Sequence, residues 1–185
     1  EKSNSNPYLE RAINSAIQIS KKIKNETAIS NGAASVSYAA VHYILNSQKQ
    51  LSDKNILLLG VGEIGQNTVE NLVKHIHKPK VKVANRTMEL AEKISEKYNI
   101  PHIDFEHFSE ELHQTDILIV ATAAQQPIVT SEHLPDGKEM LVIDLSIPNN
   151  VEKILAERDG IELVDVDKLS QHISHFILRQ MICMA

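Results

Sequence analysis

The sequence is short of cysteine, of long apolar runs and of positive charge, and each shortage excludes a class of protein. One cysteine, Cys183, in 185 residues rules out an internal disulfide framework and fits a reducing compartment. The longest apolar runs, at 56–60 and 117–121, are far below the roughly 20 residues that span a bilayer. The net charge of -5 argues against a nucleic-acid clamp, which needs a basic face. No basic, apolar leader opens the chain, and we expect a cytoplasmic protein without membrane contact.

The remaining composition is ordinary for a globular domain. Hydrophobic residues make up 42% of the chain and charged residues 23%, which argues against disorder, collagen and coiled coil. The chain starts at Glu1 without a Met and ends within a predicted helix. We therefore expect a piece of a longer protein.

Short apolar runs alternate with amphipathic segments along most of the chain. Helical spacing of apolar residues predicts two helices, over residues 9–23 and 35–48, before the first strand. We then predict strands at 55–60, 80–84, 101–105, 116–121, 140–145 and 161–164, with helices at 63–76, 87–98, 106–113, 151–158 and from 167 onward. Strands separated by helices indicate βαβ units and a parallel sheet. The predicted fold class is α/β, a doubly wound parallel sheet of about six strands preceded by two N-terminal helices.

A glycine motif joins the first strand to the following helix. Residues 60–65 read Gly60-Val61-Gly62-Glu63-Ile64-Gly65, a complete G-x-G-x-x-G in the position that a dinucleotide-binding Rossmann-type fold requires. Gly60 would allow the tight turn, Gly62 the approach of a pyrophosphate, and Gly65 close packing of helix on strand. The helix N-terminus would add free N–H groups and a positive dipole end. The alternative is a plain glycine turn.

The end of the second strand predicts which dinucleotide binds. An NAD site places Asp or Glu there, but this chain has Asn85-Arg86-Thr87. Arg86 can pair with a 2′-phosphate, and Asn85 and Thr87 can donate hydrogen bonds, so the sequence favours NADPH. Alternatively, Asn85 and Thr87 cap the next helix and Arg86 is solvated.

The fourth and fifth strands also end in candidate site residues. Thr122, Ala123 and Ala124 follow the fourth strand, where small residues would let the ribose and nicotinamide pass, unless this is only a tight loop. After the fifth strand, Asp144 and Ser146 could face the nicotinamide. For Asp144 we favour a role in holding the loop together.

No catalytic or metal-binding residue is predicted. The pairs His75/His77 and His172/His175 have no accompanying Cys or carboxylate cluster, so we interpret them as surface histidines. Cys183 has no activating neighbour in the sequence and is not interpreted as a nucleophile.

Several strings together resemble the central part of bacterial glutamyl-tRNA reductase over nearly the whole chain. These are Thr27–Val41 with its S-V-S-x-A-A-V, then GVGEIG, Ala84-Asn-Arg-Thr87, Asp144-Leu-Ser-Ile-Pro148-x-x-Val151 and Asp165-Val-Asp-x-Leu169. The glycine motif and Asn-Arg-Thr are shared with other NADP folds, including shikimate dehydrogenase. The other strings are more specific in combination.

The resemblance implies the NADPH-binding domain of an oxidoreductase that reduces glutamyl-tRNA to glutamate-1-semialdehyde in tetrapyrrole (porphyrin, haem) biosynthesis. The family's nucleophilic Cys lies in a Thr-Cys-Asn-Arg string that this chain lacks, so we expect the isolated chain to bind NADPH and to be inactive. It implies N-terminal helices over 1–50, an NADP(H)-binding domain over 51–166, and the start of a spinal helix over 167–185. It also implies glutamyl-tRNA as substrate, a homodimeric full-length protein, and a complex with glutamate-1-semialdehyde aminotransferase.

Two other functions stay open from the sequence. One is a different NADP-dependent dehydrogenase of the shikimate dehydrogenase type, which Asn-Arg-Thr permits. The other is a non-catalytic nucleotide-sensing module, because fold does not fix function.

Overall fold

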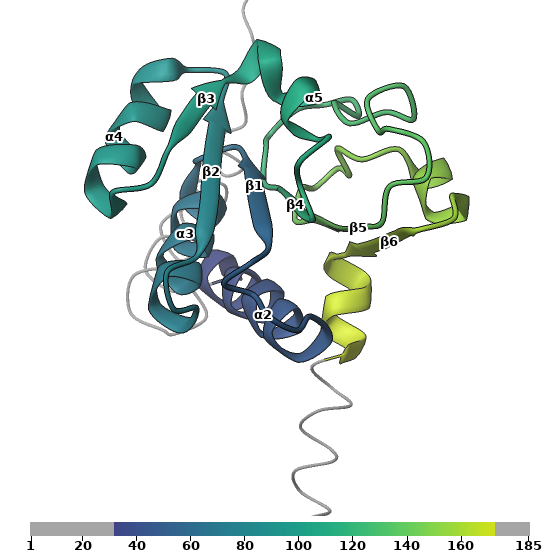
Figure 1. Ribbon diagram of the computed structural model, residues 1–185, viewed down its shortest axis with the longest axis horizontal. Helices are drawn as coiled ribbons and strands as arrows, with labels where there is room; N and C mark the ends of the chain where they lie inside the picture. The colour runs from purple at the N-terminus through teal and green to yellow at the C-terminus, as the bar shows by residue number, and fades with distance from the viewer. Residues whose placement is uncertain (1–31, 173–185) are drawn as a thin grey trace, which may run out of the picture. The chain divides into compact units, whose positions relative to one another are not determined.

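A six-stranded parallel sheet forms the centre of the computed structural model, which describes residues 32–172 (Figure 1). Its strand order is β3-β2-β1-β4-β5-β6, so the order reverses between β1 and β4. The strands are β1 (Asn55–Leu59), β2 (Lys80–Asn85), β3 (His102–Asp104), β4 (Ile117–Val120), β5 (Met140–Asp144) and β6 (Ile161–Asp165). The predicted α/β fold with a parallel sheet of six strands is confirmed.

The helices also follow the prediction, with two differences. The described α-helices are α2 (Gly32–Ser47), α3 (Glu63–His75), α4 (Met88–Tyr98) and α5 (Phe108–Glu111), and residues 166–172 are helical after β6. The predicted helix 106–113 is split into a 3-10 turn η2 (Phe105–His107) and α5. The predicted helix 151–158 is the 3-10 helix η3 (Lys153–Glu157). Of the two N-terminal helices, α2 is present, and the one predicted over 9–23 lies outside the described residues, as does Cys183.

The strands form this sheet because they are apolar on both faces. Alternate residues of β1 enter two different cores: Ile56 and Leu58 pack on one side, and Leu57 and Leu59 on the other. The first core is covered by α2, α3, part of α4 and the helix after β6, whereas α5, η3 and the loops around them cover the second. This continuous apolar pattern is typical of a parallel sheet buried on both faces.

A polar contact joins the start and the end of the described chain. The Tyr43 hydroxyl of α2 donates a hydrogen bond to the Glu162 carboxylate of β6, and the Tyr43 ring lies 4.9 Å from the His172 ring, centroid to centroid. Figure 1 shows the yellow helical segment after β6 beside one end of α2. Burial and this hydrogen bond raise the pKa of Tyr43 to about 12, so the hydroxyl stays a donor at neutral pH.

No helix among residues 32–172 is long and apolar enough to cross a membrane.

Candidate nucleotide-binding site

The glycine motif forms the turn from β1 into α3 at the reversal of strand order. Gly60 has a φ of 93°, and a Cβ there would lie 2.4 Å from the Ala121 carbonyl oxygen. A Cβ on Gly65 would lie 2.0 Å from the Gly60 carbonyl oxygen. These two positions therefore require glycine for the fold itself, because the conflicting atoms belong to the main chain.

Gly62 differs from the other two glycines of the motif. A Cβ built on it meets nothing within 4 Å, and its φ of -65° and ψ of -167° are open to any residue. It is the N-cap of α3, and no described side chain caps the helix there. The packing of residues 32–172 therefore does not require a glycine at this position, whereas the close approach of a ligand to the main chain would.

The other residues of the motif are held by their neighbours. Val61 is fully buried, and its N–H donates to the Asn85 side-chain oxygen over 3.1 Å. The Ile64 carbonyl accepts hydrogen bonds from the hydroxyls of Ser37 on α2 and Thr68 on α3, over 2.9 and 2.8 Å. Glu63 is exposed in the first turn of α3. The turn is thus fixed from both sides before any ligand arrives.

Asn85 connects this turn to the loop after β2. While its oxygen accepts the Val61 N–H, its amide nitrogen donates to the Thr87 carbonyl over 3.0 Å. Thr87 is the N-cap of α4, but its side chain makes no capping hydrogen bond. The alternative in which both side chains only cap α4 therefore does not describe this loop: Asn85 braces the main chain, and the Thr87 hydroxyl has no capping role.

Arg86 is exposed at the same edge of the sheet. Its guanidinium lies 6.0 Å from the centroid of the Phe105 ring, and none of the ion pairs among the described residues includes it. By contrast, Arg158, the other arginine among the described residues, pairs with Asp136. A cation that is stacked but not neutralised is well suited to pair with a phosphate.

The loops after β4 and β5 are joined by a network of polar side chains. The Thr122 hydroxyl donates to the Asn150 side-chain oxygen, and the Thr122 N–H donates to the Ser146 hydroxyl over 3.2 Å. The Asn150 amide nitrogen donates in turn to the carbonyls of Ala124 and Pro148, over 2.9 and 3.2 Å. Asn150 is fully buried. Ala123 is exposed and Ala124 half-buried.

Asp144 anchors the second of these loops, as we favoured from the sequence. Its carboxylate accepts the N–H groups of Ser146, Asn150 and Val151 over 3.0, 2.7 and 3.0 Å. Only 1% of the residue is exposed. Burial raises the pKa of Asp144 above its usual value, although the hydrogen bonds from these N–H groups act in the opposite direction.

Sequence reasoning missed Asn150 and the contact made by Ser37. Asn150 lies within the string after β5 that carries the family resemblance, but nothing local indicates a partner 28 residues away. Ser37 lies in the S-V-S-x-A-A-V string, and its buried hydroxyl joins α2 to the first turn of α3.

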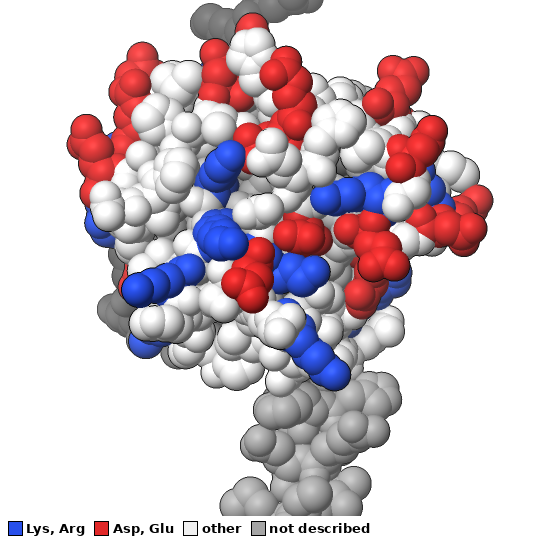
Figure 2. All heavy atoms as spheres, in the orientation of Figure 1, with Lys and Arg blue, Asp and Glu red and all other residues white. Residues whose placement is uncertain are grey.

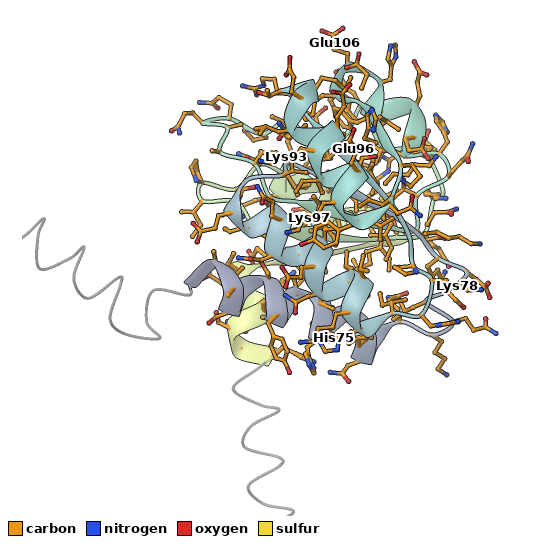
Figure 3. All side chains as sticks on the ribbon, turned by 90° about the vertical axis from the view of Figure 1, so that its left-hand side faces the viewer. His75, Lys78, Lys93, Glu96, Lys97 and Glu106 are labelled. Atoms are coloured by element: carbon orange, nitrogen blue, oxygen red, sulfur yellow. The ribbon has the colours of Figure 1, made fainter. Side chains whose placement is uncertain are left out.

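The remaining surface supplies less chemistry. On the face shown in Figure 2, acidic and basic side chains are interspersed. Figure 3 shows Lys93 and Lys97 on the outer side of α4, and His75 at the end of α3. His75 lies near His42 of α2, with 6.1 Å between the ring centroids, and no group of three or more His, Cys, Asp or Glu within 32–172 is placed to hold a metal ion.

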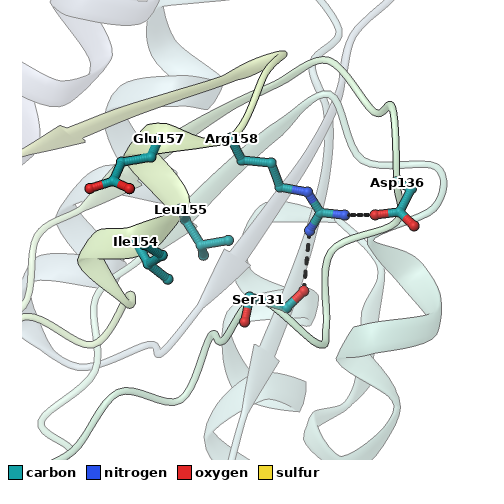
Figure 4. Close-up of a pocket in the computed structure, with 6 residues that line it drawn as sticks. All are labelled: Ser131, Asp136, Ile154, Leu155, Glu157 and Arg158. Atoms are coloured by element: carbon teal, nitrogen blue, oxygen red, sulfur yellow. Dashed lines mark hydrogen bonds and ion pairs between the residues drawn. The ribbon is translucent and has the colours of Figure 1, made fainter.

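A separate cavity of about 420 Å³ lies around η3, away from the glycine motif (Figure 4). Arg158 crosses it and pairs with Asp136, and the same guanidinium donates to the carbonyls of Ser131 and Leu134 over 3.1 and 3.0 Å. Because these contacts fix the loop before β5, we interpret Arg158 as a structural residue.

A glycine turn at the reversal point of a parallel sheet defines a Rossmann-type dinucleotide-binding domain. The family model described as shikimate / quinate 5-dehydrogenase matches residues 42–172. The match covers well over half of the chain, and the chain therefore belongs to this family.

Similar proteins support the resemblance stated from the sequence. Glutamyl-tRNA reductase from Christiangramia forsetii is 49% identical over 166 residues, which cover 90% of this chain and 40% of that protein. Among solved structures, glutamyl-tRNA reductase from Methanopyrus kandleri is 29% identical with a TM-score of 0.65, over 89% of this chain and 43% of that one. The nucleotide binding domain of glutamyl-tRNA reductase from Thermoplasma volcanium, 23% identical with a TM-score of 0.59, has the same fold over 80% of this chain and 96% of its own.

The predicted similarity to glutamyl-tRNA reductase is thereby confirmed. The chain spans about 40% of the length of the curated relatives that it matches. Glutamyl-tRNA reductases with this fold imply a nicotinamide nucleotide as cofactor. The open space at Gly62 fits such a group, because a pyrophosphate needs close access to the main chain there.

Proposed function

We propose that this chain is the NADPH-binding domain of a glutamyl-tRNA reductase. The single observation that carries the proposal is Gly62, which the fold does not require and a pyrophosphate does. The main-chain N–H groups of the first turn of α3, at Glu63, Ile64 and Gly65, would hold the phosphates. When bound, the nucleotide supplies the hydride for reduction.

The preference for NADPH rests on Arg86. Its guanidinium is exposed beside β2 and free of ion pairs within the described residues, and Asn85 stands where an NAD site has a carboxylate. The Asn85 brace fixes the main chain on both sides of Arg86. We propose that Arg86 pairs with the 2′-phosphate, that the Thr87 hydroxyl donates to it, and that Thr122, Ala123 and Ala124 line the path toward the nicotinamide.

Titration of the chain with NADPH and NADH tests this proposal. We expect NADPH to bind more tightly, and Arg86→Ala to remove about 1.5–3 kcal/mol, roughly ten- to hundredfold, from NADPH binding alone. Lys93→Ala is the matched control, because it removes the same charge from an exposed position on α4. Equal affinities of wild type and Arg86→Ala for NADPH would refute the assignment of the 2′-phosphate site.

The activity of the longer protein extends the proposal. We propose that it reduces glutamyl-tRNA to glutamate-1-semialdehyde, with the reactive thiol supplied by a preceding domain, and that this chain positions the cofactor toward it. Residues 1–50, 51–166 and 167–185 would then be the N-terminal helices, the nucleotide domain and the start of the spinal helix. A homodimer, and a complex with glutamate-1-semialdehyde aminotransferase, belong to the same proposal. Formation of semialdehyde by the isolated chain would contradict this division of labour.

A second candidate is a dehydrogenase of the shikimate dehydrogenase type, to which the family model relates this chain by fold. The gene upstream of Glu1 distinguishes the two. A Thr-Cys-Asn-Arg string there supports the reductase, and a substrate domain with a Lys-Asp pair supports the dehydrogenase. A neighbour without either set of catalytic residues would favour the nucleotide-sensing module.

A further inference from the structure

Ile147 is an exposed apolar residue on a loop that hydrogen bonds hold in place. It is 83% exposed, more than any other large hydrophobic residue described. Single exposed apolar residues are common on protein surfaces. This one differs in its setting, because its neighbour Ser146 is buried and the loop is fastened at both ends by Asp144. These hydrogen bonds hold the main chain on both sides of Ile147 in place.

Contacts between neighbouring loops place Ile147 at the carboxyl edge of the sheet, beyond β4. The Ser146 hydroxyl accepts the Thr122 N–H, and Thr122 directly follows Ala121, which lies against Gly60. Thus Ile147 lies on the β5 side of the glycine turn, whereas Arg86 lies on the β2 side.

A dinucleotide in this site must extend in both directions from its pyrophosphate. If the phosphates lie at Gly62 and the 2′-phosphate of the adenosine half at Arg86, the other half can only run toward the ends of β4 and β5. That half carries the nicotinamide. The nicotinamide ring would therefore lie beside the loop that carries Ile147.

We infer that Ile147 forms an apolar wall against the nicotinamide ring and so favours the reduced cofactor. The inference rests on the proposed function. The reduced ring is neutral and gains from contact with an aliphatic side chain, whereas the oxidised ring carries a positive charge that loses hydration there. Ile147 thus acts as a determinant of both affinity and redox preference.

The test compares three ligands on wild type and Ile147→Ser: NADPH, NADP⁺ and adenosine 2′,5′-bisphosphate, which lacks the nicotinamide half. We expect the substitution to weaken NADPH binding by about three- to tenfold, from partial loss of apolar burial. The affinity for NADP⁺ should fall less, and the affinity for the bisphosphate should not change. Ile154→Ser is the matched control, because Ile154 is also exposed, at 55%, but lies on η3 at the Arg158 cavity.

The outcomes separate this inference from the proposed function. Unchanged NADPH affinity in Ile147→Ser, or an equal loss for all three ligands, would overturn the role of Ile147 while leaving the nucleotide site in place. If wild type binds neither NADPH nor the bisphosphate, the proposed function fails and the inference fails with it. Circular dichroism of each variant checks that the fold is retained, as the exposure of both side chains predicts.

Discussion

Two alanine substitutions in the glycine motif separate what the fold requires from what a ligand requires. In Gly65→Ala the new Cβ lies 2.0 Å from the Gly60 carbonyl oxygen and 2.9 Å from its carbon, so the main chain of the turn or the helix must move. In Gly62→Ala the new Cβ meets nothing within 4 Å, and the backbone already has angles that alanine adopts. The two substituted positions lie three residues apart, and each variant adds the same methyl group.

The expected stabilities follow from these contacts. Overpacking at Gly65 costs about 3 kcal/mol, the upper end of the usual range because the clash is with the main chain, and the better helix propensity of alanine offsets about 1, which leaves a loss of about 2 kcal/mol. At Gly62, the lower entropy of the unfolded chain stabilises by about 0.4–1 kcal/mol. Alanine is a poorer N-cap than glycine by a similar amount, so the two effects offset to within about 1 kcal/mol.

Thermal unfolding and nucleotide titration measure the two effects. For a chain of this size we expect the melting temperature of Gly65→Ala to fall by about 4–8 °C and that of Gly62→Ala to stay within about 4 °C of wild type. NADPH affinity should nevertheless fall at least about tenfold in Gly62→Ala, because the methyl group occupies the space that the pyrophosphate needs. A Gly62→Ala variant that binds NADPH like wild type would refute the assignment of this turn as the phosphate site.

The two side chains that brace the loops at this edge give further predictions. Asn85→Asp keeps an acceptor for Val61 but loses the donor to Thr87 and adds a negative charge, so NADPH affinity relative to NADH should fall more than about tenfold in paired titrations. Asp144→Asn places an amide NH₂ group, which cannot accept a hydrogen bond, among main-chain N–H donors. It should lower the free energy of unfolding, measured with denaturant, by about 1–3 kcal/mol. Because the folded pKa of Asp144 is raised, its contribution is complete below about pH 3.9, the unfolded value, and declines as pH rises through the folded pKa. The advantage of wild type over Asp144→Asn should therefore shrink from pH 3.5 to 7, and an advantage that grows would contradict the dominance of burial.

Local patterns in the sequence were enough to predict the sheet and the glycine turn. The apolar runs of β1, β4 and β5 identify buried parallel strands because every residue of these runs faces one of two cores. The turn was recognisable because the positive φ of Gly60 and the contact of Gly65 with the Gly60 carbonyl oxygen both lie inside one strand–turn–helix unit. Such short-range requirements leave a signature in neighbouring letters of the sequence.

The η3 segment and the loop network could not be predicted in the same way. In η3 only Leu155 is buried, so this segment lacks the continuous apolar face of an amphipathic α-helix and forms a 3-10 turn instead. Asn150 is buried as part of a network with Thr122 and Ala124, which lie 28 and 26 residues earlier. Its role depends on the register that brings β4 and β5 side by side, and no local pattern carries that information.

The braces have a consequence for binding that the glycine motif alone would not have. Asn85 ties the loop after β2 to the turn after β1, and Asn150 ties the loop after β5 to the loop after β4. All buried polar side-chain atoms among the described residues have hydrogen-bond partners, so these loops are ordered by the protein itself. The entropy of ordering them is then lost on folding rather than on binding, which leaves more of the contact energy for affinity. Removing a brace should therefore weaken nucleotide binding even where the side chain never touches the nucleotide. Such a result would distinguish Asn85, a positioning residue, from Arg86, for which we propose direct pairing with the 2′-phosphate.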